Sequence, residues 1–156
     1  MMEWTGALRA VAGAFFGTLG FVCLVRAPRR AWIPAGMIAA LAYLADWLMI
    51  YFGVSEPLAV FFSTLMGSLM CHLLARKMKM INTVFLMAAI VPVVPGLGLY
   101  RMMEAFGSGQ TAAGADKGVD AMIIIAMTAV GLAMGTFIDH ILHRQKMNTK
   151  FHRAVR

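Results

Sequence analysis

The chain has 156 residues, of which 61% are hydrophobic and 13% charged, and its formal net charge at pH 7 is +7. Soluble proteins carry about a quarter charged residues on average, so this composition excludes an ordinary soluble domain and indicates an integral membrane protein. A positive net charge also suits nucleic-acid binding, but nearly all lysines and arginines lie in short loops and in the C-terminal tail. Membrane topology places them there, so we expect a lipid bilayer around the chain and no nucleic-acid partner.

Five apolar segments can cross a bilayer as helices, each of which needs about 20 residues. The sequence therefore predicts an all-α fold, an integral membrane helical bundle with five transmembrane helices. Residues 1–142 form the predicted transmembrane domain and residues 143–156 a basic cytoplasmic tail. The glycine-rich polar stretch before the fifth segment is predicted to be a flexible loop. The predicted spans are about 4–25, 32–52, 58–75, 80–106 and 119–142.

Positive charge alternates from one connection to the next. The loops at 26–30 and 76–79 and the tail are strongly basic, whereas the N-terminus, the 53–57 turn and the 107–118 loop carry almost no net positive charge. Basic loops of membrane proteins lie in the cytoplasm. We therefore expect the N-terminus outside and the C-terminus in the cytoplasm.

Two G-x-x-x-G patterns occur in the predicted helices. The first is formed by Gly13 and Gly17, and the second by Gly131 and Gly135. Small residues at this spacing let two helices approach closely, although the pattern is common in membrane helices. We expect these two faces to make contacts between subunits.

The fourth segment carries two prolines and two glycines within a few positions, Pro92, Pro95, Gly96 and Gly98. A proline lacks an N–H and clashes with the carbonyl one turn back, which argues for a helix broken at this PxxPG motif. Transporters use such breaks to hold substrate, because the second half-helix points its N-terminal N–H groups at an anion. Here these groups belong to Gly96, Leu97 and Gly98.

A fixed charge and a phenol hydroxyl follow this predicted half-helix terminus. Arg101 comes about one turn later, and Tyr100 either belongs to the aromatic belt of the membrane boundary or lines the substrate path. The residues that we predict to bind substrate are Pro92, Pro95, Gly96, Leu97, Gly98, Tyr100 and Arg101.

Charged side chains within spans are costly and are usually functional or paired. By the predicted topology, one polar layer in the outer half of the membrane contains Arg9, Asp46, Thr64, Arg101 and Glu104. Two interpretations stay open. In the structural one, Arg9 neutralises Asp46, and the i, i+3 spacing of Arg101 and Glu104 suits a second ion pair. In the functional one, Arg101 binds a carboxylate, and Asp46 or Glu104 takes up a proton coupled to transport.

The inner ends of the segments carry histidines beside an aspartate. We expect His72 to be an interfacial residue rather than a proton relay, and the group of Asp139, His140 and His143 needs no metal beside a basic tail. A nucleophile elbow, HExxH, paired CxxC and phosphate loop are all missing from the sequence. We therefore predict no enzyme activity, no catalytic residue, no metal site and no cofactor.

The run from Ala88 to Gly96, followed by Tyr100, resembles the threonine/serine exporter family. That family shows an apolar run into P-x-x-P-G with a tyrosine four residues after the glycine, and the likeness is to its small five-span subunit. The chain length, the basic loops before the second and fourth segments and the glycine-rich first helix are similar as well.

This resemblance implies a larger subunit of the same exporter family as partner, in a bacterial inner membrane. It also implies export of a small carboxylate substrate, namely threonine, serine or a dicarboxylate such as succinate. Five spans rarely form a complete transport path, so a hetero-oligomer or a homo-oligomer is required. The alternative function is a non-transporting membrane scaffold or assembly subunit, whose prolines only kink a helix for packing.

Overall fold

The computed structural model describes residues 4–79, 85–87 and 96–154, and in these ranges every regular element is a helix. The all-α prediction is thus confirmed for this part of the chain. The elements are α1 (Trp4–Leu24), the short 3-10 helix η1 (Arg29–Ala31), α2 (Trp32–Tyr51), α3 (Glu56–Met78), α5 (Gly96–Gly107) and α6 (Thr111–Ala154).

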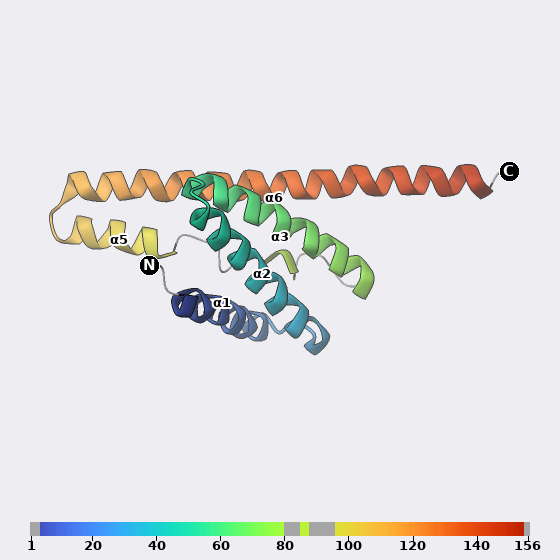
Figure 1. The fold of residues 1–156 in the computed structure, drawn as a ribbon, viewed down its shortest axis with the longest axis horizontal. Helices are drawn as coiled ribbons and strands as arrows, with labels where there is room; N and C mark the ends of the chain where they lie inside the picture. The colour runs from blue at the N-terminus through green and yellow to red at the C-terminus, as the bar shows by residue number, and fades with distance from the viewer. Residues whose placement is uncertain (1–3, 80–84, 88–95, 155–156) are drawn as a thin grey trace.

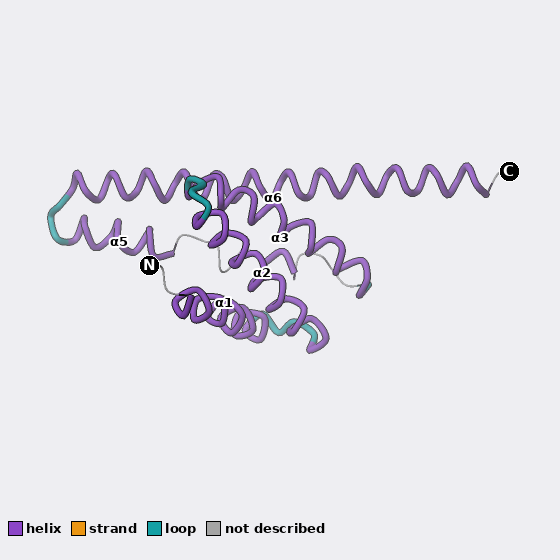
Figure 2. Tube along the Cα trace, viewed as in Figure 1, coloured by secondary structure: helices purple, strands orange, loops and turns teal. Residues whose placement is uncertain are grey.

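The helices pack side by side in the order α1, α2, α3, α6 and α5. Figure 1 shows α6 as one long, straight helix, with α3 against its middle and α5 folded back along its first part. Short turns join α2 to α3 and α5 to α6, as Figure 2 shows in teal. The described helices therefore form an array in which α6 contacts both α3 and α5.

Three helical stretches are long and apolar enough to cross a membrane, namely Arg29–Tyr51, Glu56–Met78 and Thr111–Leu142, and a shorter apolar helix covers Leu8–Leu24. These stretches make the chain a multi-pass membrane protein. The described part of α5 has 12 residues, which corresponds to about 18 Å along a helix. The predicted break at Pro92 and Pro95 lies outside the described residues.

The first three helices begin and end close to the predicted segments, but α6 does not. It starts at Thr111, inside the stretch predicted to be a flexible loop, and has 44 residues. That prediction was wrong because Gly114 and Gly118 serve close packing rather than flexibility. An added Cβ would lie 3.0 Å from the Phe106 ring at the first glycine and 2.9 Å from the Met102 sulfur at the second.

The sequence of α3 suits both of its ends. Pro57 lies in the first turn, where its missing N–H is not needed. Glu56 in the first turn and Arg76 and Lys77 in the last turn complement the helix dipole. The helix ends at Met78, and the capping residue Lys79 has a left-handed φ of 52°. Arg76 and Lys77 therefore lie on the helix and not in the predicted loop.

The main apolar cluster joins α1, η1, α2 and α3 near their basic ends. Small side chains dominate it, which lets the helices approach closely. The Cys71 sulfur lies 3.2 Å from the carbonyl oxygen of Phe85, and the Trp32 indole N–H donates to the Ala27 carbonyl at 3.0 Å. The cluster consists of Val22, Ala27, Ala31, Ala35, Ile38, Cys71, Ala75 and Phe85.

Candidate functional site

Two glycines of α6 bring it into close contact with α3. A Cβ at Gly131 would collide with the Thr64 hydroxyl, and a Cβ at Gly135 would lie 2.6 Å from the Cβ of Ser68. The second G-x-x-x-G pattern thus joins two helices of the same chain. The expectation that this face contacts another subunit was wrong, because α3 already covers it.

The first G-x-x-x-G pattern has the opposite environment. A Cβ added at Gly13 or Gly17 would meet no atom within 4 Å, and the same holds for Gly6 and Gly20 of α1. This glycine face is uncovered in the described chain. A contact between subunits through α1 therefore stays a prediction.

Polar residues of α3 follow the contact with α6 at four-residue intervals: Thr64, Ser68, His72 and Arg76. The first three are 3%, 0% and 8% exposed. The Ser68 hydroxyl donates to the Leu132 carbonyl of α6 at 3.4 Å. His72 Nδ1 lies 2.7 Å from the Ser68 carbonyl oxygen, and since a carbonyl only accepts, Nδ1 carries the proton. His72 is therefore buried, and its predicted position at the membrane interface stays a prediction.

An ion pair lies at the end of α3, at the last of these regularly spaced polar residues. The Arg76 guanidinium donates to a carboxylate oxygen of Asp139 at 2.5 Å and to the Asp139 carbonyl at 3.5 Å. The Asp139 side chain is 11% exposed and that of Arg76 39%. The pair therefore fixes α3 to α6, with one charge nearly buried and the other partly in contact with the surroundings.

Sequence reasoning missed this pair because it assigned Arg76 to a loop and grouped Asp139 with histidines of its own helix. A signal was present in the sequence. Arg76 continues the four-residue spacing of Thr64, Ser68 and His72, which predicts a common helix face. Following that spacing would have extended α3 to Arg76 and placed its charge beside a neighbouring helix.

Asp46 lies on α2 toward α3. Its Oδ1 atom is buried and has no hydrogen-bond partner among the residues that the structure describes. The carboxyl group interacts with the Ser63 side chain and with the charge of Glu56. Ser63 is fully buried, and its hydroxyl donates to the Val60 carbonyl at 3.0 Å. A carboxylate with another acidic residue and no cation beside it is poorly compensated.

The two predicted ion pairs are not formed in the structure. Among the side chains that the structure describes, the ion pair present is the one between Arg76 and Asp139. Arg9 is exposed on α1, and both Arg101 and Glu104 are exposed on α5. These side chains are open to lipid, water or another chain, so their roles stay predictions.

The predicted polar layer is not brought together either, because α5 and α3 flank different parts of α6 (Figure 1). Gly118 of α6 faces Met102, whereas Gly131 faces Thr64. These two glycines are 13 residues apart, which corresponds to about 20 Å along a helix. Arg101, next to Met102, therefore lies at a level far from Thr64.

The residues predicted to form the second half-helix lie in α5, whose described part begins at Gly96. The restart of the helix after a break stays a prediction. No atom lies within 4 Å of a Cβ added at Gly96, and Tyr100 is 63% exposed. Pro92 and Pro95 lie outside the described residues. Among the described residues, nothing covers Gly96 at the start of α5.

Comparison with known proteins identifies a matching protein family. A family model described as Threonine/Serine exporter, ThrE, matches residues 10–138. The match runs from α1 to the residue before Asp139 and includes the PxxPG motif. No solved structure matches the chain.

Proposed function

The chain belongs to the threonine/serine exporter family, and from this premise we propose that it is a subunit of an inner-membrane secondary transporter that exports small carboxylate-bearing metabolites. Threonine and serine are the first candidates, because the family description names them. A dicarboxylate such as succinate is the other candidate, since it presents the same chemical group. The family match over residues 10–138 is the observation that carries the proposal.

A larger subunit of the same family is the proposed partner. Two uncovered surfaces support this: the glycine face of α1 and the start of α5. The glycine face has no neighbour within 4 Å at Gly13 or Gly17, although small residues in membrane helices favour close packing. The described helices of a single copy are arranged along α6 (Figure 1), and five spans rarely form a complete transport path. A homo-oligomer is the alternative assembly.

The proposed substrate site is the start of α5. The free N–H groups of a helix N-terminus and its dipole, worth about half a positive charge, attract a carboxylate. Gly96, Leu97 and Gly98 supply these N–H groups, and Arg101 adds a full positive charge about one turn later. Glycine at the first position lets the substrate approach the backbone closely. The PxxPG segment before α5 is the proposed hinge.

Asp46 is the proposed proton-coupling residue. A buried carboxylate oxygen without a hydrogen-bond partner, with Glu56 rather than a cation acting on it, supports this role. Ionisable groups inside membranes commonly mark ion and proton pathways. Binding of a proton removes the uncompensated charge, and its release restores the charge, so the two states have different interactions with α3. Glu104 and Arg9, both exposed, are the second candidates.

Efflux of labelled threonine, serine and succinate from cells without their own exporters tests the proposal. The chain is expressed alone, with its genomic partner, and with the partner plus Arg101→Ala. Lys117→Ala is the matched control, since Lys117 is also exposed and lies on α6 beside α5. We expect efflux only with both chains, a loss of at least tenfold in Arg101→Ala and normal efflux in Lys117→Ala.

The same assay contradicts the proposal in two ways. If none of the three compounds leaves cells that contain both chains at normal levels, the substrate class is wrong. If Arg101→Ala and Lys117→Ala reduce efflux equally, the start of α5 is not the substrate site.

A further inference from the structure

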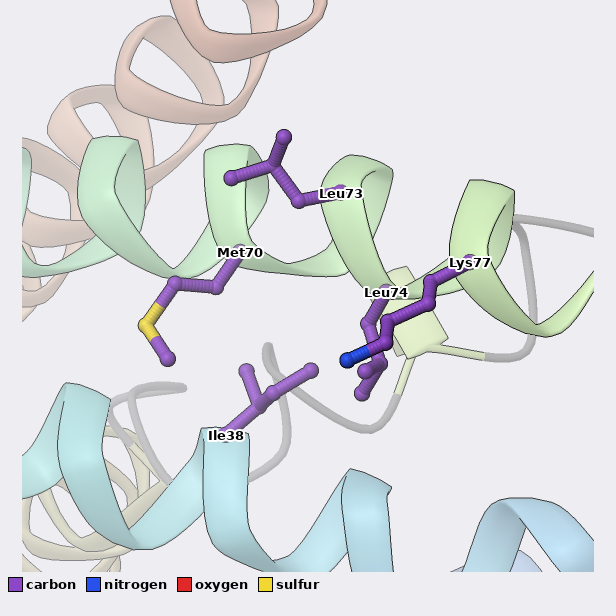
Figure 3. Close-up of a pocket in the computed structure, with 5 residues that line it drawn as sticks. All are labelled: Ile38, Met70, Leu73, Leu74 and Lys77. Atoms are coloured by element: carbon purple, nitrogen blue, oxygen red, sulfur yellow. The ribbon is translucent and has the colours of Figure 1, made fainter.

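A pocket opens between α2 and α3 near the basic end of α3. Its volume is about 220 Å³, and it is lined by Ile38, Met70, Leu73, Leu74 and Lys77. Four of these side chains are apolar and one is a cation. In Figure 3 the two helices form the walls of the pocket, and Met70, Leu74 and Lys77 of α3 extend toward Ile38 of α2, whereas Leu73 points away from α2.

The ammonium group of Lys77 has an unusual position. Figure 3 shows it turned back toward the pocket, beside Leu74 and above Ile38. No carboxylate pairs with Lys77 among the residues that the structure describes, whereas the adjacent Arg76 has Asp139. Lys77 is exposed, so its ammonium group is accessible to an anion at the mouth of the pocket. The pocket is thus complementary to a ligand with an apolar part and an anionic end.

The position of the pocket along α3 matches the depth of one lipid leaflet. α3 is a candidate membrane span that ends at Met78, so Lys77 lies at the membrane boundary. Met70 lies seven residues earlier, about 10 Å deeper along the helix. The apolar wall therefore extends from head-group level into the hydrocarbon. By the positive-inside rule the basic end of α3 faces the cytoplasm, where anionic lipids are enriched.

From this complementarity we infer that the α2–α3 pocket binds an anionic phospholipid of the cytoplasmic leaflet. One acyl chain lies against Ile38, Met70 and Leu74, and the head-group phosphate contacts the Lys77 ammonium. A free phosphate ion is a poorer candidate ligand, because it would not cover the apolar side chains of the pocket. A partner helix, about 10 Å across, is too wide for a pocket of this volume. A zwitterionic lipid brings a second cation to Lys77 and binds less well.

The test is lipid binding by the purified full-length chain in detergent, followed by native mass spectrometry and by the melting temperature. Three compounds are compared: phosphatidylglycerol, phosphatidylcholine with the same acyl chains, and glycerol phosphate, which has no chain. We expect phosphatidylglycerol to bind most tightly and to raise the melting temperature most. Glycerol phosphate is expected to have no effect.

Variants then separate the pocket from general attraction to charge. Lys77→Gln is expected to weaken phosphatidylglycerol binding about fivefold, which corresponds to the attraction of one lysine to an anionic surface. Lys77→Arg keeps the charge and is expected to keep the preference. Lys79→Gln removes a charge from the same end of α3 but does not line the pocket, so binding is expected to stay within twofold.

Three results overturn the inference. Equal binding of phosphatidylglycerol and phosphatidylcholine excludes recognition of the anionic head group. An equal loss in Lys77→Gln and Lys79→Gln means that the basic end of α3 attracts lipid without a site. If glycerol phosphate, which has no acyl chain, stabilises the protein by itself, the ligand is a free phosphate and not a lipid. Because no transport is measured, these outcomes do not depend on the proposed exporter function.

Discussion

The ion pair between Arg76 and Asp139 is expected to contribute unequally to stability, depending on which partner is removed. Arg76→Ala leaves the Asp139 carboxylate without a cation, and that side chain is 11% exposed. Asp139→Ala leaves the Arg76 guanidinium, which is 39% exposed and has a long aliphatic stem that can turn toward water. The first variant should therefore be the more damaging one.

The exposed fractions of the Asp139 and Arg76 side chains determine how much stability each variant is expected to lose. Removal of one partner from a fully buried pair costs about 3–5 kcal/mol, whereas a pair at the surface contributes about 0–1 kcal/mol. For Arg76→Ala, which strands the nearly buried charge, we expect a loss near the lower end of the buried range, about 3 kcal/mol. For Asp139→Ala, which strands the exposed charge, we expect about 1 kcal/mol. The double variant strands no charge and should be more stable than Arg76→Ala alone.

The assay is unfolding of the purified chain in mixed detergent micelles with increasing dodecyl sulfate, followed by circular dichroism, for the wild type, both single variants and the double variant. Such a cycle isolates the energy of the pair itself. Arg30→Ala, which removes an exposed arginine from η1, is the control and should change stability by less than about 0.5 kcal/mol. Additive losses in the double variant, or equal losses in the two single variants, would refute the reasoning.

Three further predictions concern the glycines and Asp46. Gly135→Ala places a Cβ 2.6 Å from that of Ser68 and should lower the unfolding midpoint, whereas Gly13→Ala, with no atom within 4 Å, should leave it unchanged; the same dodecyl sulfate titration checks both. Gly114→Val should separate α5 from α6, which a disulfide cross-linking yield between cysteines placed on the two helices would detect as a decrease. Asp46→Asn should abolish transport driven by a pH gradient but keep exchange of labelled for unlabelled substrate across liposomes. Glu56→Gln, its acidic neighbour, should keep both; loss of exchange in Asp46→Asn would contradict a coupling role.

Hydrophobicity alone predicted the first three helices well. Their apolar runs have the length of a membrane span and end at basic or turn-forming residues, so local sequence is sufficient there. The start of α6 could not be predicted from hydrophobicity. Gly114 and Gly118 have the same local pattern in a flexible loop as in a helix that packs closely, and only the neighbouring Phe106 and Met102 decide between the two.

The candidate site was predictable only in part. A helix after the PxxPG motif is present as α5, but the break that proline and glycine predict falls outside the described residues and stays a prediction. Depth in the membrane was inferred by counting residues from each segment end, and this failed for Arg101 because α5 flanks the part of α6 beyond α3. The pair of Arg76 and Asp139 joins residues far apart in the sequence, which periodicity within one helix cannot reveal.

The most direct test of the central claim is release of labelled threonine from liposomes that contain this chain, its larger partner, or both. We expect release with both chains together, faster when a proton gradient is imposed, and retention of the label with either chain alone. Retention with both chains, when each is shown to be inserted and folded, would contradict the assignment of this chain as an exporter subunit. Equal release by the larger chain alone would show that this chain takes no part in transport.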